Sequence, residues 1–190
     1  DGGIVSVIGG TGTIFVAERP GSIGTVNIGA APGNAPVAAG FLNATSVLFG
    51  NGAPTAATLN FNHTAADYVF SPVIGGNGNV NVFSGTTIVT ANNPYTGNTT
   101  ISGGTLAVGD PTHPSAALSG GGNVTIAPGA TLGGYGSVTG TVFNSGTVAA
   151  ASALPVFAGG PFGSLTINGN CVGNGGLLNV RTVLAGDGST

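Results

Sequence analysis

The stretch VLFGNGAPTAATLNFNHTAADYVF, residues 47–70, contains three pairs of apolar residues with one residue between the members of each pair. The pairs are Val47-x-Phe49, Leu59-x-Phe61 and Tyr68-x-Phe70. Side chains two positions apart point to the same face of a β-strand, so each pair predicts a short strand with one apolar face. Glycine, asparagine and alanine fill the segments between the pairs. The stretch therefore predicts short strands that succeed one another along the chain.

Pairs of this kind recur at a regular spacing. One series begins at Val5, Val26, Val47 and Tyr68, with successive members 21 residues apart. A second series lies between them: Ile14-x-Val16, Leu59-x-Phe61, Val80-x-Val82, Ile101 and Val124-x-Ile126. A fixed period of about 20 to 50 residues is typical of repeat proteins, and strands at this period predict a β-solenoid. We expect one inner face to hold, in consecutive coils, Val26, Ile28, Val47, Phe49, Tyr68 and Phe70.

Composition supports an all-β solenoid. Glycine supplies 38 of the 190 residues, charged residues are 4% of the chain, and Met and Trp are absent. The strong helix formers Glu, Lys, Gln and Met are scarce or missing, which disfavours helices. At about 21 residues per coil the chain would make about nine coils, a column on the order of 40 Å tall. Outward Thr, Ser and Asn side chains are expected to form hydrogen-bonded ladders between coils.

The chain is expected to form one continuous domain, residues 1–190. Residues 1–90 carry the regular 21-residue period. Residues 91–190 also contain short apolar segments separated by glycines, but at a more variable spacing. Two segments rich in Ala, Ser and Pro, Pro111–Gly121 and Ala149–Phe162, are predicted to be bulges on the coil instead of strands.

Charge and cysteine content exclude several classes of function. The net charge is −3 and the only cations are Arg19 and Arg181, so a nucleic-acid partner is not expected. No apolar run approaches the roughly 18 residues of a membrane-spanning helix. Cys171 is the single cysteine, which rules out an internal disulfide. Its strand parity predicts an inward, buried thiol.

No catalytic, cofactor-binding or metal-binding residue is predicted, and the chain is not expected to be an enzyme. The five carboxylates are spread along the sequence, whereas a glycosidase needs two facing each other across the bond it cleaves. His63, Asp67 and Ser71 have the residue types of a hydrolase triad but no nucleophile elbow, and we interpret them as surface polar residues. Asp110 and His113 share a turn and lack the further ligands that a metal needs.

One glycine-rich segment imitates a calcium-binding repeat. Residues 75–83, GGNGNVNVF, match the β-roll nonapeptide except that Val80 stands where the carboxylate should be. Without that carboxylate the segment is interpreted as a corner followed by a strand.

Residues 93–109, NPYTGNTTISGGTLAVG, resemble the autotransporter-associated β-strand repeat, which reads roughly N-x-Y-T-G-x-T-x-I-x-x-G-T-L-x-x-G. Residues 122–148 are similar to the coils that follow that repeat, so residues 91–162 are read as passenger-repeat coils. Residues 163–190 resemble the start of the autochaperone region of such passengers. The resemblance implies a right-handed, single-stranded parallel β-helix, exported to the bacterial cell surface through an outer-membrane barrel. It implies no particular activity.

Three functions remain open at the level of sequence. The preferred hypothesis is an extracellular stalk or spacer segment of a surface autotransporter passenger, with adhesion to glycans of a host or neighbouring cell as a further option. The alternative is a filament subunit that joins end to end by strand pairing, since uncovered strand edges pair with other chains. The third is a β-helix that binds or cleaves glycans.

Overall fold

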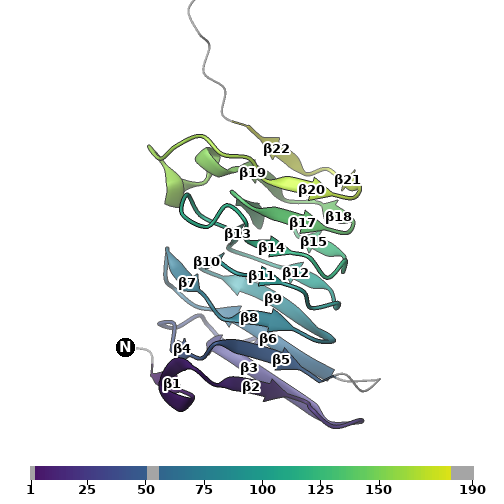
Figure 1. Ribbon diagram of the computed structural model, residues 1–190. Helices are drawn as coiled ribbons and strands as arrows, with labels where there is room; N and C mark the ends of the chain where they lie inside the picture. The colour runs from purple at the N-terminus through teal and green to yellow at the C-terminus, as the bar shows by residue number, and fades with distance from the viewer. Residues whose placement is uncertain (1–2, 51–55, 181–190) are drawn as a thin grey trace, which may run out of the picture.

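The computed structural model describes residues 3–50 and 56–180, in which the chain winds as a stack of short parallel strands (Figure 1). Each coil contributes one strand to each of three faces, and strands of successive coils pair in parallel. The fold is a parallel β-helix, which confirms the predicted class. The helices among the described residues are three single 3-10 turns: η1 (Ile8–Gly10), η2 (Ala151–Ala153) and η3 (Pro155–Phe157).

The first face is one unbroken seven-stranded sheet. Its strands in chain order are β3 (Ile23–Gly29), β6 (Ala56–Asn62), β9 (Gly78–Ser84), β12 (Thr99–Ile101), β15 (Val124–Ile126), β18 (Val142–Asn144) and β21 (Cys171–Gly173). Because it passes through every coil, the described residues complete seven coils, and β22 begins an eighth. The predicted count of about nine assumed a constant coil length, which the structure does not have.

The other two faces are each divided into two sheets. On the second face, β1 (Ile4–Ser6) pairs with β4 (Phe41–Asn43). Its six-stranded sheet comprises β7 (Tyr68–Phe70), β10 (Thr86–Val89), β13 (Thr105–Val108), β16 (Thr131–Gly134), β19 (Thr147–Ala150) and β22 (Leu177–Asn179). The third face holds β2 (Thr13–Val16), β5 (Ser46–Phe49) and β8 (Val73–Gly75). A four-stranded sheet follows there: β11 (Asn92–Asn93), β14 (Ala117–Leu118), β17 (Ser137–Thr139) and β20 (Thr166–Asn168).

The predicted 21-residue register is wrong, although the predicted inner residues largely do face inward. Val26 pairs with Leu59, Val47 pairs with Ile14, and Tyr68 pairs with Thr87, so the three predicted neighbours lie on three different faces. Equivalent residues of successive coils are 33, 21, 19 and 25 positions apart on the first face. The corner loops cause the difference, because they vary in length while the strands stay short.

A column of apolar side chains fills the helix. Val47, Phe49, Leu59 and Phe61 are fully buried, and Phe70 packs edge-on against Phe61 with ring centroids 5.2 Å apart. Full burial of each such side chain contributes about 1.5–3 kcal/mol. The second predicted series is confirmed from coil two onward, because Phe61, Val82, Ile101 and Ile126 lie in one register column.

A second apolar cluster lies outside the column, on the outer face of the six-stranded sheet. The segment after β19, residues 151–162, folds through η2 and η3 and places Leu154 and Phe157 against Ile88, Ala107 and Ala149. A Cβ added at Gly133 would meet Leu154 at 2.8 Å, so a small residue is needed beneath it. We call residues 151–162 the flap. The predicted bulge at 149–162 is therefore largely correct, whereas the one at 111–121 contains the strand β14.

The predicted autochaperone-like segment is described only as far as residue 180, and residues 181–190 lie outside the described part. Within that part no helix is long and apolar enough to cross a membrane.

Candidate functional site

The Asn93–Gly109 motif forms one turn of the helix, and its distinctive residues are used inside the fold. Asn93 is fully buried between β8 and β11, which are not paired as strands. Its Oδ1 accepts a hydrogen bond from Ile74 N at 2.8 Å, and its Nδ2 donates to Ala91 O at 2.8 Å. The Asn93 amide thus bridges two coils where the backbone ladder is interrupted. We call this place the seam.

Tyr95 is also internal. Its ring stands edge-on to Phe49 with centroids 6.2 Å apart, and its hydroxyl is hydrogen-bonded to Thr99 Oγ1. Burial raises the pKa of Tyr95 to about 12, although the hydrogen bond with Thr99 works in the opposite direction. The phenol is therefore protonated at physiological pH, and both its ring and its hydroxyl contact residues of the core.

The glycines of the motif permit close approach between coils. A Cβ at Gly97 would collide with Gly78 O of the preceding coil, and one at Gly104 would collide with Gly85 O. Gly104 also has φ +67°, a conformation that side-chain-bearing residues rarely adopt. The buried residues and the glycines of the motif that carries the family resemblance therefore specify how a coil is built, while Thr96, Asn98 and Ser102 of the motif lie exposed on its surface.

The structure does not assemble His63, Asp67 and Ser71 into a triad. His63 is fully buried, while Asp67 and Ser71 are exposed. The His63 Nε2 and the Thr87 Oγ1 are 2.9 Å apart, and the His63 Nδ1 has no hydrogen-bond partner of ordinary geometry.

The interpretation of His63 as a surface residue is wrong. Its backbone bridges to Val37 in the long corner loop of the preceding coil, and its ring packs 5.1 Å from that of Tyr68. Burial lowers the pKa of His63 below its ordinary value of 6.5, and the backbone of Ala65 offsets this only in part. His63 is a neutral member of the core at physiological pH.

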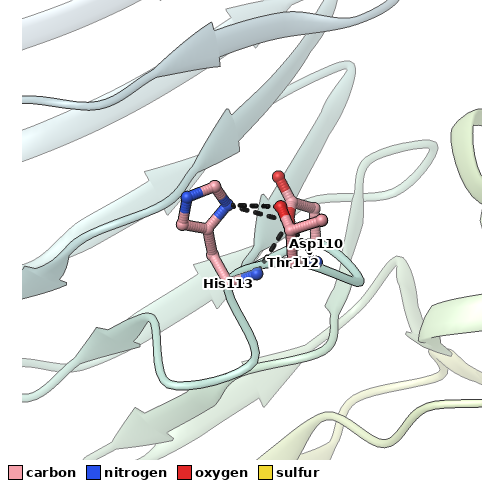
Figure 2. Close-up of polar contacts among 3 residues, drawn as sticks. All are labelled: Asp110, Thr112 and His113. Atoms are coloured by element: carbon pink, nitrogen blue, oxygen red, sulfur yellow. Dashed lines mark hydrogen bonds and ion pairs between the residues drawn. The ribbon is translucent and has the colours of Figure 1, made fainter.

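Asp110, Thr112 and His113 form a self-contained turn after β13 (Figure 2). Asp110 Oδ1 accepts hydrogen bonds from Thr112 N and His113 N, both at 2.8 Å, and lies 2.9 Å from His113 Nδ1. Partial burial acts to raise the pKa of Asp110, but the hydrogen bonds from Thr112 and His113 outweigh it and hold the pKa below its ordinary value. This carboxylate fixes the turn.

Metal-binding chemistry finds no support in the described residues. They contain no group of three or more His, Cys, Asp or Glu side chains that could hold an ion. In the segment that imitates a calcium repeat, Val80 is buried within β9 and points into the core.

Cys171 departs from its predicted environment. It pairs with the inward residue Val142, so its parity is as predicted, but the thiol is exposed. The reason is that β21 is the terminal strand of the seven-stranded sheet among the described residues. Strand parity determines direction, whereas burial also requires a neighbouring coil.

The outer face of the seven-stranded sheet carries two neutral polar columns. One contains Thr25, Thr58 and Asn79, and the other is a ladder of Asn27, Asn60 and Asn81. Asn81 Nδ2 donates to Asn60 Oδ1 at 2.9 Å, and Asn60 Nδ2 donates to Asn27 Oδ1 at 2.8 Å. These contacts confirm the predicted side-chain ladders. We call the second column the asparagine ladder.

Three proteins are similar to about two thirds of the chain. It is 40% identical over 124 residues, 64% of its length, to the adhesin BmaC autotransporter of Brucella suis biovar 1 (strain 1330), of which it covers 3%. Two Escherichia coli (strain K12) proteins are also similar. The uncharacterized lipoprotein YdeK is 36% identical over 64% of the chain, and the uncharacterized protein YuaQ is 37% identical over 66%.

The chain spans only 9% of each Escherichia coli protein. No protein-family model and no solved structure matches the chain. Similarity to a named autotransporter nevertheless confirms the resemblance to autotransporter passengers that the Asn93–Gly109 motif suggested.

Proposed function

We propose that this chain is a structural spacer within an autotransporter-like surface protein, in which its coils extend the polypeptide away from the cell envelope. The observation that carries the proposal is the unbroken seven-stranded sheet, which joins all seven coils into one column. The motif residues support it, because Asn93, Tyr95 and the motif glycines serve coil geometry. The names of the adhesin BmaC autotransporter and the lipoprotein YdeK support a location at the cell surface or envelope.

The test changes the number of coils in the parent protein. Removing residues 105–130 deletes one complete coil and leaves Thr131 in the register position of Thr105. In a second variant, residues 105–130 are present as three tandem copies. The purified segment should then be longer than the parent by about 4.8 Å per added coil, as measured by small-angle scattering. A spacer tolerates both changes with its surface display and target binding retained. Loss of binding in a folded, displayed deletion variant would contradict the proposal.

A second candidate is that the segment itself adheres, as the name of one relative suggests. The observation that favours it is the neutral polar surface of the seven-stranded sheet, where Thr25, Asn79 and Thr125 are exposed. Uncharged hydroxyl and amide groups suit the glycans of a host or neighbouring cell. Replacing these three residues by alanine leaves cell binding unchanged for a spacer and abolishes it for an adhesive face.

The filament alternative has an observation of its own. Large apolar residues are exposed at both ends of the described stack, among them Ile4 (72%) and Leu178 (71%). End-to-end pairing would cover them. Sedimentation of the chain across a wide concentration range decides this, since a filament subunit grows in mass with concentration and a spacer segment stays monomeric.

A further inference from the structure

The flap leaves a hollow between itself and the outer face of the six-stranded sheet. Figure 1 shows the flap as the irregular segment next to β19, at the side of the stack. The hollow measures about 240 Å³, and three separate parts of the chain line it. These are Ala66 before β7, Thr86 and Thr105 on β10 and β13, and Pro155 and Val156 of the flap. Ala66 and Pro155 are exposed, so the hollow reaches the surface.

The floor of the hollow is polar. Thr86 and Thr105 are register partners on neighbouring parallel strands, about 4.8 Å apart. Thr87 and Leu106, which follow them, are buried in the column, so the two threonines point outward, where each is half-buried. Among the described residues, neither threonine hydroxyl takes part in a hydrogen bond. The floor therefore offers two hydroxyl groups that can donate to and accept from a ligand.

The roof of the hollow, residues 155–156, is apolar and held in place. Leu154 and Phe157 flank it in the sequence, and both are buried against the sheet. The Phe157 ring packs edge-on against Tyr135 with centroids 5.2 Å apart, and the Tyr135 hydroxyl donates a hydrogen bond to a backbone carbonyl of the flap at 2.6 Å. Pro155 begins η3, and its ring fixes the backbone φ there. Anchors on both sides thus preform the hollow.

The lining selects the chemistry of a ligand. No charged side chain lines the hollow among the described residues, so an ion would lose hydration without gaining a partner. A wholly apolar ligand would cover the two hydroxyls without satisfying them. The volume lies below the roughly 300–1,000 Å³ of sites for drug-sized ligands, which suits a single ring. A sugar ring meets all three requirements, because it carries hydroxyl groups at its edge and C–H groups on its faces.

We propose that the hollow binds one uncharged sugar ring at the end of a glycan. The hydroxyl groups of the ring pair with Thr86 and Thr105, and its C–H groups pack against residues 155–156. Insertions in repeat proteins often form the binding face, and the flap is such an insertion. This site is separate from the exposed face that carries Thr25 and Asn79. It is also independent of the spacer role, since a spacer can carry a ligand site.

The experiment titrates sugars into the isotope-labelled full chain and follows the backbone amide signals by nuclear magnetic resonance. The probes are the methyl glycosides of glucose, galactose, mannose and N-acetylglucosamine. Glucuronate, a charged ring, and cyclohexanol, a ring with a single hydroxyl, test the ligand class. Thr86→Val and Thr105→Val remove one hydroxyl each and keep a β-branched side chain suited to a strand. The matched control is Thr131→Val, at the next position of the same column and outside the lining.

At least one glycoside is expected to shift the amides of Thr86, Thr105 and Val156, with a Kd on the order of 1 mM. Thr86→Val and Thr105→Val should each weaken binding at least about threefold, while Thr131→Val leaves it unchanged. No shift with any glycoside, or equal affinity in all three variants, would overturn the site. Tighter binding of glucuronate or cyclohexanol would overturn the ligand class. Shifts confined to the face of Thr25 and Asn79 would place glycan binding there instead.

Discussion

The side chain of Asn93 should hold the third face of the helix together, and its replacement by alanine tests this directly. Asn93→Ala removes the acceptor for Ile74 N, a buried donor, and such an unsatisfied group costs about 1–3 kcal/mol. It also removes the donor to Ala91 O, which keeps its second hydrogen bond from Ala117 N at 3.1 Å. That loss adds about 0.5–1.5 kcal/mol. We expect the free energy of unfolding to fall by about 2–4 kcal/mol.

The matched control is Asn92→Ala. Asn92 precedes Asn93 in the same two-residue strand, is the same residue type, and is exposed. It should change the free energy of unfolding by no more than about 0.5 kcal/mol. Urea unfolding of both variants and the parent measures the difference at unchanged slope. If the two variants agree within about 0.5 kcal/mol, the Asn93 amide does not support the seam.

Three other predictions concern the core, the buried histidine and the scarcity of cations. Phe49→Asp places an unpaired charge at a fully buried site and should cost several kcal/mol, whereas Phe15→Asp, at a side chain 55% exposed, should melt close to the parent. Because burial lowers the pKa of His63 in the folded chain, the unfolded chain takes up the proton first. Stability should therefore be flat above pH 6.5 and decline below it, and a His63→Asn variant that declines in the same way would refute this assignment. Trypsin should leave the chain nearly whole, because a proline follows Arg19 and the only other site is after Arg181; several tryptic fragments would contradict this.

Strands and inner faces could be predicted from the sequence because alternation within a strand is local. Pairs such as Leu59-x-Phe61 show their inward face in three residues, whatever the rest of the chain does. The stacking of one coil on another depends on corner length, which no local pattern reports. The corner between β3 and β4 is long, so Val26 lies against Leu59 and not against Val47.

The candidate site was less predictable, for the same reason. The burial of His63 depends on Val37 in a different coil, and the exposure of Cys171 depends on the position of β21 at the end of its sheet. The flap could be recognised as an irregular segment from its Ala, Ser and Pro content. The docking of the flap on Ile88 and Ala107 could not be predicted, because nothing in the sequence distinguishes these two residues from other residues of β-strands.

The seam has a mechanical consequence for a column under load. The first face is hydrogen-bonded without interruption from β3 to β21, while the second face is divided between β4 and β7 and the third between β8 and β11. Both divisions flank the third coil, where side chains such as those of Tyr68 and Asn93 replace strand pairing. Elsewhere in the column, a force that pulls the ends apart is therefore shared by the backbone hydrogen bonds of three sheets. On either side of the third coil, only two of the three faces carry such hydrogen bonds. The column should bend toward its continuous sheet and open on the opposite side, so the third coil is where tension would first separate one half from the other.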